Sequence, residues 1–189
     1  MVTYSRIDRK DIDWIIAWTF ENLTKGDYIR SCILESAAEG NYYGVKAVEG
    51  ERIVGFLTFK RGIAFTYPHP ELEREIAGLA DEDTVFNGDG IYVSPEYRRG
   101  GVGSTMTRMA REQMLELGGV WFLGELWIYP DGQIPSASPT EDYGITEFER
   151  TVPMFYAENE KYGLECAICG RHCRCGAVVR LVRLERERE

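Results

Sequence analysis

The feature that most constrains the fold is a glycine-rich turn between a strand-like run and an amphipathic helix pattern. The turn reads Arg-Arg-Gly-Gly-Val-Gly-Ser over residues 98–104 and follows a strand-like run over residues 84–93. The helix pattern after it places five apolar side chains at helical spacing: Met106, Met109, Ala110, Met114 and Leu117. Glycines let backbone amides approach a ligand, and amides at a helix N-terminus bind anions. The turn therefore predicts a site for a diphosphate, with a ligand-free glycine turn as the alternative.

A second apolar run, over residues 120–129, follows the helix pattern. A strand, a helix and a strand in this order form a right-handed parallel crossover. We therefore predict an α/β fold built on a mixed sheet, with the element order α-α-β-β-β-α-β-α-β-β. The expected helices cover residues 8–23, 27–38, 104–117 and 153–162, and the expected strands cover residues 42–48, 52–60, 84–93, 120–129, 164–169 and 177–185.

Length and charge limit the class of protein. A chain of 189 residues, 44% apolar, is expected to form a single domain over residues 1–189, with an insertion at residues 131–150 and a frayed tail at residues 186–189. A net charge of −9 argues against nucleic acid as a partner. We find neither a membrane-spanning stretch nor a secretory signal in the sequence, so we expect a cytoplasmic location away from membranes. The sequence leaves open whether the chain forms a homodimer.

At the glycine-rich turn the chain resembles the GNAT family, the Gcn5-related N-acetyltransferases. The family pattern is apolar-x-Val-x-Pro-x-Tyr-Arg-Gly-x-Gly-Ile-Gly, and residues 91–103 read Ile-Tyr-Val-Ser-Pro-Glu-Tyr-Arg-Arg-Gly-Gly-Val-Gly. Arg99 and Gly100 look like a swap of the family's usual order, in which the glycine comes first. The resemblance implies that acetyl-CoA is the co-substrate. It also implies that the following backbone holds the pantetheine arm and the diphosphate: Ile91, Tyr92, Val93, Arg98, Arg99, Gly100, Gly101, Val102, Gly103 and Ser104.

Two acidic residues are candidates for the general base that an amine acceptor needs. Glu125 is the one acid in the apolar run over residues 120–129, where a buried carboxylate needs a partner or a function. Asp89 is the second candidate, because some members of the resembled family place their base on the preceding strand. Structural roles are the alternatives, with Glu125 as a hydrogen-bonded acid and Asp89 in a bulge or turn.

The family often uses a tyrosine, four residues before the glycine of a Tyr-Glu-Lys-Leu-Gly-Phe ending, to protonate the leaving CoA thiolate. Asn159 occupies that position here, so the resemblance assigns Asn159 to the cofactor site, although an amide cannot act as an acid. Tyr156 lies one helical turn earlier and is the candidate acid. A packing role is the alternative for Tyr156.

Four of the five cysteines lie close together near the end of the chain, at Cys166, Cys169, Cys173 and Cys175. Thiolates in this number are enough for a tetrahedral zinc ion. If residues 170–171 form a two-residue hairpin turn, Cys169 points away from the other three and leaves a poor tetrahedron. We therefore expect unligated thiols and no metal site, with zinc or a transient disulfide as alternatives.

Together these inferences predict an enzyme that transfers an acetyl group from acetyl-CoA directly to a primary amine of a small molecule or protein. Residues 27–41, 61–83 and 131–150 are expected to select the amine. A non-catalytic acyl-CoA-binding or sensor module on the same fold is the first alternative, because the usual tyrosine is missing. A zinc-dependent interaction protein is the second.

Overall fold

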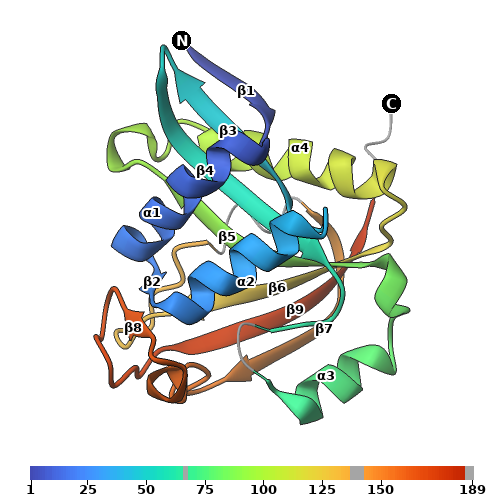
Figure 1. The fold of residues 1–189 in the computed structure, drawn as a ribbon. Helices are drawn as coiled ribbons and strands as arrows, with labels where there is room; N and C mark the ends of the chain where they lie inside the picture. Colours follow the sequence, from blue (N-terminus) through green and yellow to red (C-terminus); the bar gives the residue numbers. More distant parts are fainter. Residues whose placement is uncertain (66–67, 137–142, 186–189) are drawn as a thin grey trace.

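The computed structural model describes residues 1–65, 68–136 and 143–185, and a seven-stranded mixed sheet forms its centre (Figure 1). The strands are β1 (Val2–Arg6), β3 (Tyr43–Glu49), β4 (Arg52–Arg61), β5 (Val85–Val93), β6 (Trp121–Ile128), β7 (Gly144–Val152) and β9 (Gly176–Leu184). Their order across the sheet is β1-β3-β4-β5-β6-β9-β7. Strands β5 and β6 run parallel and the other neighbours run antiparallel, so the predicted mixed sheet and its parallel crossover are confirmed.

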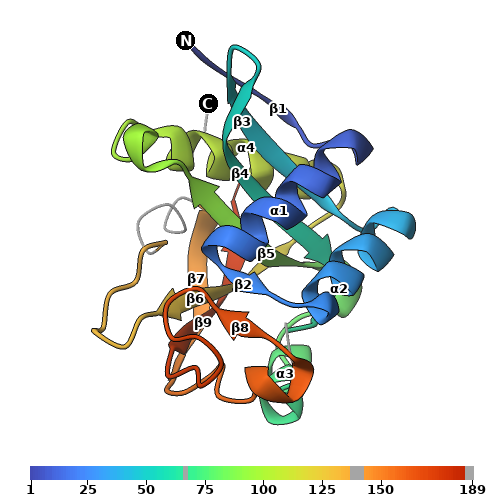
Figure 2. The same cartoon turned by 60° about the vertical axis from the view of Figure 1, so that its left-hand side comes forward.

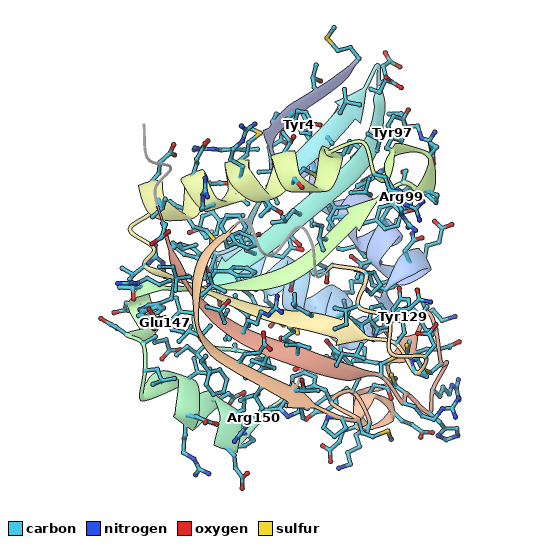
Figure 3. The ribbon with its side chains drawn as sticks, turned by 180° about the vertical axis from the view of Figure 1, so that it is seen from behind. Tyr4, Tyr97, Arg99, Tyr129, Glu147 and Arg150 are labelled. Carbon is cyan, nitrogen blue, oxygen red and sulfur yellow. The ribbon has the colours of Figure 1, made fainter. Side chains whose placement is uncertain are left out.

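Helices cover both faces of the sheet. They are α1 (Ile12–Asn22), α2 (Asp27–Ala38), α3 (Pro70–Ala77) and α4 (Val102–Glu116). Helix α4 buries Met106 against one face, in a cluster that includes Leu57 of β4. Helix α1 buries Ile15 against the opposite face, in a cluster that includes Phe56 of the same strand. Successive side chains of a strand point to opposite faces, so Phe56 and Leu57 separate the two layers. Figure 3 shows α4 lying across the sheet on the side away from α1.

The predicted element order lacks strand β1 and helix α3, and it is wrong in three further places. The helix expected over residues 153–162 is a series of turns that ends in the 3₁₀ helix η5 (Asn159–Tyr162), and Met154 has a left-handed φ of 54° that interrupts any helix. The insertion expected at residues 131–150 contains most of strand β7. The strand expected over residues 164–169 is the two-residue β8 (Glu165–Cys166), which leaves the main sheet and pairs with β2 (Thr24–Lys25).

The missed elements share a polar sequence. Strand β7 lies at the edge of the sheet and exposes Thr146, Glu147 and Glu149, and charged edges protect a sheet from further pairing. Strand β1, at the other edge, is short and half polar, and helix α3 lies within the predicted connection over residues 61–83. The predicted frayed tail at residues 186–189 lies outside the described residues. Within the described part of the chain, the helices are too short or too polar to cross a membrane.

Candidate functional site

The site is a cleft that opens where β5 and β6 separate. The two strands pair through Val85 with Trp121, Phe86 with Phe122 and Asn87 with Leu123, and pairing stops there. Beyond that point β5 continues along β4 as far as Val93, while β6 continues along β9 as far as Ile128. The cleft has a volume of about 880 Å³ and is lined by both strands, by the end of α1 and by the first turn of α4.

A β-bulge at Asp89 accompanies this separation. Thr58 of β4 pairs with Gly90 and the next residue, Phe59, pairs with Gly88, so Asp89 is an extra residue in β5. A bulge bends its strand and increases the local twist. The bend follows the last β5–β6 pair by two residues, which turns the upper half of β5 away from β6. The bulge that the sequence offered as the structural alternative for Asp89 is therefore present.

The glycine-rich turn lies at the end of β5 and leads directly into α4. Gly101 caps the helix with a left-handed φ of 80°, and Arg99 has a left-handed φ of 62°. The amides that begin α4 have neither a side-chain cap at Gly101 nor an acidic residue in the first turn. Because the first amides of a helix have no partner inside it, this end of α4 is suited to an anion. Figure 3 shows Arg99 beside this turn, on the same side of the molecule as Tyr129.

In the upper half of β5, every second residue directs its backbone N–H and C=O groups toward the cleft. The amide of Ser94 donates to the carbonyl oxygen of Val54 in β4 with an N-to-O distance of 2.8 Å, as in an ordinary ladder bond. The N–H and C=O groups of successive residues point to alternate sides of a strand, so those of Val93 and Ile91 face away from β4. The Val93 carbonyl accepts instead from Nε of Arg98 at 2.9 Å. Ile91, Tyr92 and Val93, the residues that the resemblance assigned to the pantetheine arm, all line the cleft.

The two candidate bases both reach the cleft, in different surroundings. Glu125 is half-buried on β6, two residues beyond the last pair with β5. The Oδ2 atom of Asp89 accepts from the hydroxyl of Tyr42 at 2.8 Å and from that of Thr58 at 3.4 Å, and the ammonium of Lys60 lies 3.8 Å from Oδ1. The Asp89 carboxylate is thus held by three neighbours. Burial, followed by the charge of Asp89, raises the pKa of the Tyr42 phenol well above its usual value, so this hydroxyl stays a donor.

Tyr156 lines the cleft, whereas Asn159 does not. The amide of Tyr156 donates to the Cys175 carbonyl at 3.4 Å, and its ring lies edge-on to Trp127 of β6 at 6.1 Å. Asn159 is 1% exposed, and its side-chain Nδ2 donates to the Leu164 carbonyl at 3.2 Å. The Asn159 side chain therefore supports the loop after η5. It does not line the cofactor cleft, as the resemblance implied it would.

Sequence reasoning missed several residues of the cleft. Tyr129 follows β6 and lines the cleft beside Arg98, and burial raises the pKa of its phenol while the Arg98 cation opposes that rise. Its amide donates to the Gln133 carbonyl at 2.9 Å, and residues 133–136 also line the cleft. On the other side, Leu23 and Thr24 at the end of α1 form part of the lining. The sequence signal that could have indicated this part of the cleft was the aromatic pair Trp127 and Tyr129 at the end of an apolar run.

The four clustered cysteines lie beside the cleft, and the prediction that Cys169 points away from the others is wrong. The sulfur atoms of Cys166, Cys169, Cys173 and Cys175 all lie within 4.8 Å of one another. Cys166 forms a bridge with Gly170, so the turn spans residues 167–169 and not 170–171. This earlier turn brings Cys166 and Cys169 to the same side. Cys166 and Cys173 also line the cleft.

Comparisons with known proteins agree with this geometry. The model of the acetyltransferase (GNAT) family matches residues 10–137. Among curated protein sequences, none matches the chain. NAA60 of Arabidopsis thaliana, solved with acetyl-CoA, has a similar structure with a TM-score of 0.65 at 13% identity, covering 97% of this chain and 98% of that chain.

Two structures from Escherichia coli also have a similar fold at low sequence identity. The ribosomal-protein-S18-alanine N-acetyltransferase has a TM-score of 0.59 at 13% identity, covering 100% of this chain and 97% of that chain. The family member YhbS, in complex with CoA, has a TM-score of 0.55 at 10% identity, covering 97% of this chain and 82% of that chain. These likenesses show the fold, and the family match extends over more than half of the sequence. The chain belongs to the acetyltransferase (GNAT) family.

Proposed function

We propose that the protein transfers the acetyl group of acetyl-CoA to a primary amine of a small molecule or protein by direct attack. The observation that carries this proposal is the separation of β5 from β6. The separated part of β5 leads to the first turn of α4, which has no side-chain cap. A pantetheine arm lying along β5 would bring its diphosphate to the amides of residues 98–104. Similar structures solved with acetyl-CoA and CoA support this ligand.

The chemistry requires a neutral amine at the thioester carbon. A lysine-like amine with a pKa of about 10.4 is charged at pH 7, and its deprotonation costs about 4.6 kcal/mol. We assign the base to Glu125, because it lines the cleft on β6 two residues beyond the point where β6 separates from β5. Glu125 takes the amine proton directly or through a water molecule while the nitrogen attacks.

We assign the remaining steps of the reaction to a backbone amide of β5 and to a phenol side chain. The new N–C bond forms while the thioester oxygen gains negative charge, and the Val93 amide is the donor that we assign to this oxygen. The C–S bond then breaks, the CoA thiolate takes a proton from a phenol of the cleft, and the phenolate recovers the second proton that the nitrogen releases. We assign this phenol to Tyr156, which lines the cleft with its ring 6.1 Å from that of Trp127.

The test is acetyl transfer from acetyl-CoA to a panel of amines. The panel contains polyamines, aminoglycosides, free lysine and peptides that begin with alanine, because one similar structure is named for an alanine acceptor. The expected result is equal amounts of free CoA and of product heavier by one acetyl group. Binding of acetyl-CoA without turnover on any amine would favour the alternative, a non-catalytic acyl-CoA-binding module. Failure to bind acetyl-CoA would overturn both.

A further inference from the structure

We propose that Cys166, Cys169, Cys173 and Cys175 hold one zinc ion in a tetrahedral site beside the cleft. The four residues lie in the segment that joins η5 to β9, and Figure 2 shows this segment looping around β8 next to β2. Their sulfur atoms all lie within 4.8 Å of one another. The Cys166 and Cys175 sulfurs are 4.0 Å apart, and the Cys169 and Cys175 sulfurs are 3.5 Å apart. A zinc ion with Zn–S bonds of about 2.3 Å requires sulfur atoms about 3.8 Å apart.

The backbone around Cys166 is shaped to support a thiolate. The amides of Ile168 and Cys169 donate to the Cys166 sulfur at 3.3 and 3.4 Å. Gly170, with a left-handed φ of 72°, closes the turn by donating its amide to the Cys166 carbonyl at 2.9 Å. Hydrogen bonds to a sulfur favour its charged form, and metal ligands must be deprotonated. A Cys-x-x-Cys-Gly turn therefore presents two sulfurs to one point and stabilises the charge on the first.

The donor set selects a thiophilic metal. His172 lies inside the sequence of the cluster, but its side chain is 87% exposed and its Nδ1 lies 3.1 Å from a carboxylate oxygen of Glu160. The ligands are therefore four sulfurs, which suit zinc in a structural site. Four thiolates around Zn²⁺ carry a charge of −2, and the exposed Arg171 and Arg174 flank the cluster with the opposite sign.

Neither a disulfide nor an apolar core accounts for this loop as well as a metal does. A disulfide bond is about 2.05 Å long, well below the observed separations between sulfur atoms. Of the described residues 163–175, only Glu165 and Cys166 lie in a strand of the named sheets, and Leu164 is the one buried side chain besides Cys166, Cys173 and Cys175. Small segments without an apolar core of their own need a cross-link, and a metal supplies one.

The site would fix one wall of the cleft. Cys166 lies in β8 and pairs with Thr24 of β2, and the next amide, of Ala167, donates to the Leu23 carbonyl at 2.9 Å. Leu23, Thr24, Cys166 and Cys173 all line the cleft. Cys175 directly precedes β9. One ion bound to these cysteines would tie the α1–α2 connection to the sheet.

The experiment is elemental analysis of the full-length protein, purified under reducing conditions without chelators. We expect about one zinc ion per chain. The protein should also take up Co²⁺ after zinc removal and show the visible bands of tetrahedral cobalt bound by four thiolates. Cys169→Ser should lose most of the metal and bind Co²⁺ with altered bands. Cys32→Ser is the matched control, because Cys32 lies in α2 outside the cluster, and it should retain the full metal content.

Three results would overturn the proposal. The first is a metal-free protein that binds neither Zn²⁺ nor Co²⁺ although all its thiols react with a thiol reagent. The second is a native mass lower by two hydrogens, which would show a disulfide within the cluster. The third is stoichiometric iron with the colour of an iron–thiolate centre, which would exclude the assignment to zinc. All three are measured on the wild-type protein, so they decide the proposal even if Cys169→Ser folds poorly.

Discussion

In the turn before α4, the left-handed backbone conformation falls on Arg99 and not on the neighbouring Gly100, which could adopt it without strain. Arg99 adopts a left-handed φ of 62°, whereas Gly100 beside it lies outside the left-handed region. The family pattern places a glycine first and a variable residue second, so the swap seen in the sequence has a cost in the structure. A left-handed conformation costs a non-glycine residue roughly 1–2 kcal/mol.

We expect Arg99→Gly to stabilise the protein. Relief of the left-handed strain outweighs the extra entropy of a glycine in the unfolded chain, which costs about 0.5–1 kcal/mol. The net rise in the free energy of unfolding should be about 0.5–1 kcal/mol, measured from the urea midpoint at constant slope. Gly101→Ala is the matched control, because Gly101 has a φ of 80°, and it should lose about 1 kcal/mol. An unchanged or lower midpoint for Arg99→Gly would contradict the argument.

Binding of acetyl-CoA should depend on Gly103. The glycine lies in the first turn of α4 and lines the cleft, so Gly103→Val would place a branched side chain where we put the diphosphate. We expect at least about a tenfold loss of affinity by calorimetry, which corresponds to about 1.4 kcal/mol. Glu112→Val, which puts the same residue at an exposed position of the same helix, should leave the affinity nearly unchanged. Equal affinities for the wild type and Gly103→Val would move the diphosphate elsewhere.

The turn and α4 could be predicted from the sequence because their signals are local. Met106, Ala110 and Met114 recur at helical spacing, and all three are fully buried against the sheet. The position of Asn159 could not be predicted in this way. Its alignment with a family tyrosine says nothing about the turns that replace the expected helix, and those turns place the side chain under the Leu164 carbonyl.

The cysteine cluster shows a second limit of local reasoning. The alternation rule for side chains is sound, but it depends on where the turn is placed. A turn three residues earlier than expected, around residues 167–169, reverses the prediction for Cys169. Strand β7 was missed for a different reason, because its charges at Glu147 and Glu149 resemble those of a loop, although edge strands commonly carry them.

The catalytic assignment predicts a strong effect of Glu125→Gln. The loss of general-base assistance typically lowers a rate by about 10² to 10⁴. We expect kcat/KM at pH 7 to fall at least about 100-fold while the affinity for acetyl-CoA is retained, with a smaller deficit at high pH, where the amine loses its proton unaided. Asp89→Asn should have the smaller effect. Glu147→Gln on the exposed edge strand is the control and should behave as the wild type.

A pH–rate profile of the variants with one amine decides between the two carboxylates. A defect confined to Asp89→Asn would assign the base to β5. Unfolding of Glu125→Gln, detected by circular dichroism, would indicate that Glu125 serves the fold and not the reaction.

Replacing Asn159 with the tyrosine that the family often has at this position should destabilise the protein. Asn159 is 1% exposed, so the larger ring of Asn159→Tyr overfills its site and removes the hydrogen bond to Leu164. We expect a loss of about 2–4 kcal/mol in the free energy of unfolding and no gain in kcat. The measurements are urea unfolding and turnover. A stable and faster variant would show that position 159 reaches the leaving thiolate after all.

Stability should fall as the pH drops through the titration of His69. Burial lowers the pKa of His69, while Glu73 and Glu158 oppose this shift, and its ring stacks on Phe155 at 3.9 Å. Because the pKa is lower in the folded chain than in the unfolded chain, the stabilisation is complete above the usual histidine pKa and is lost as the pH falls through the folded value. Thermal unfolding at about pH 8 and about pH 6 should therefore show a decline for the wild type.

His69→Phe keeps a ring in the stack and cannot titrate, so its decline between the two pH values should be smaller. Identical declines in the two proteins would show that other groups cause the pH dependence.

The sheet consists of two halves that share a buried core but whose strands pair over only three residues. Strands β1, β3, β4 and β5 form one half, and β6, β9 and β7 form the other. In the described chain, β5 and β6 are joined by the pairing of Val85–Asn87 with Trp121–Leu123 and by the bond from Val120 to Thr84 beside it. Across the cleft, the β2–β8 pair and the bond from Ala167 to Leu23 join the connection after α1 to the segment before β9. Loss of these contacts across the cleft would leave every strand pair within each half intact, and the bonds at and beside Val85–Asn87 would be the remaining backbone connection between β5 and β6.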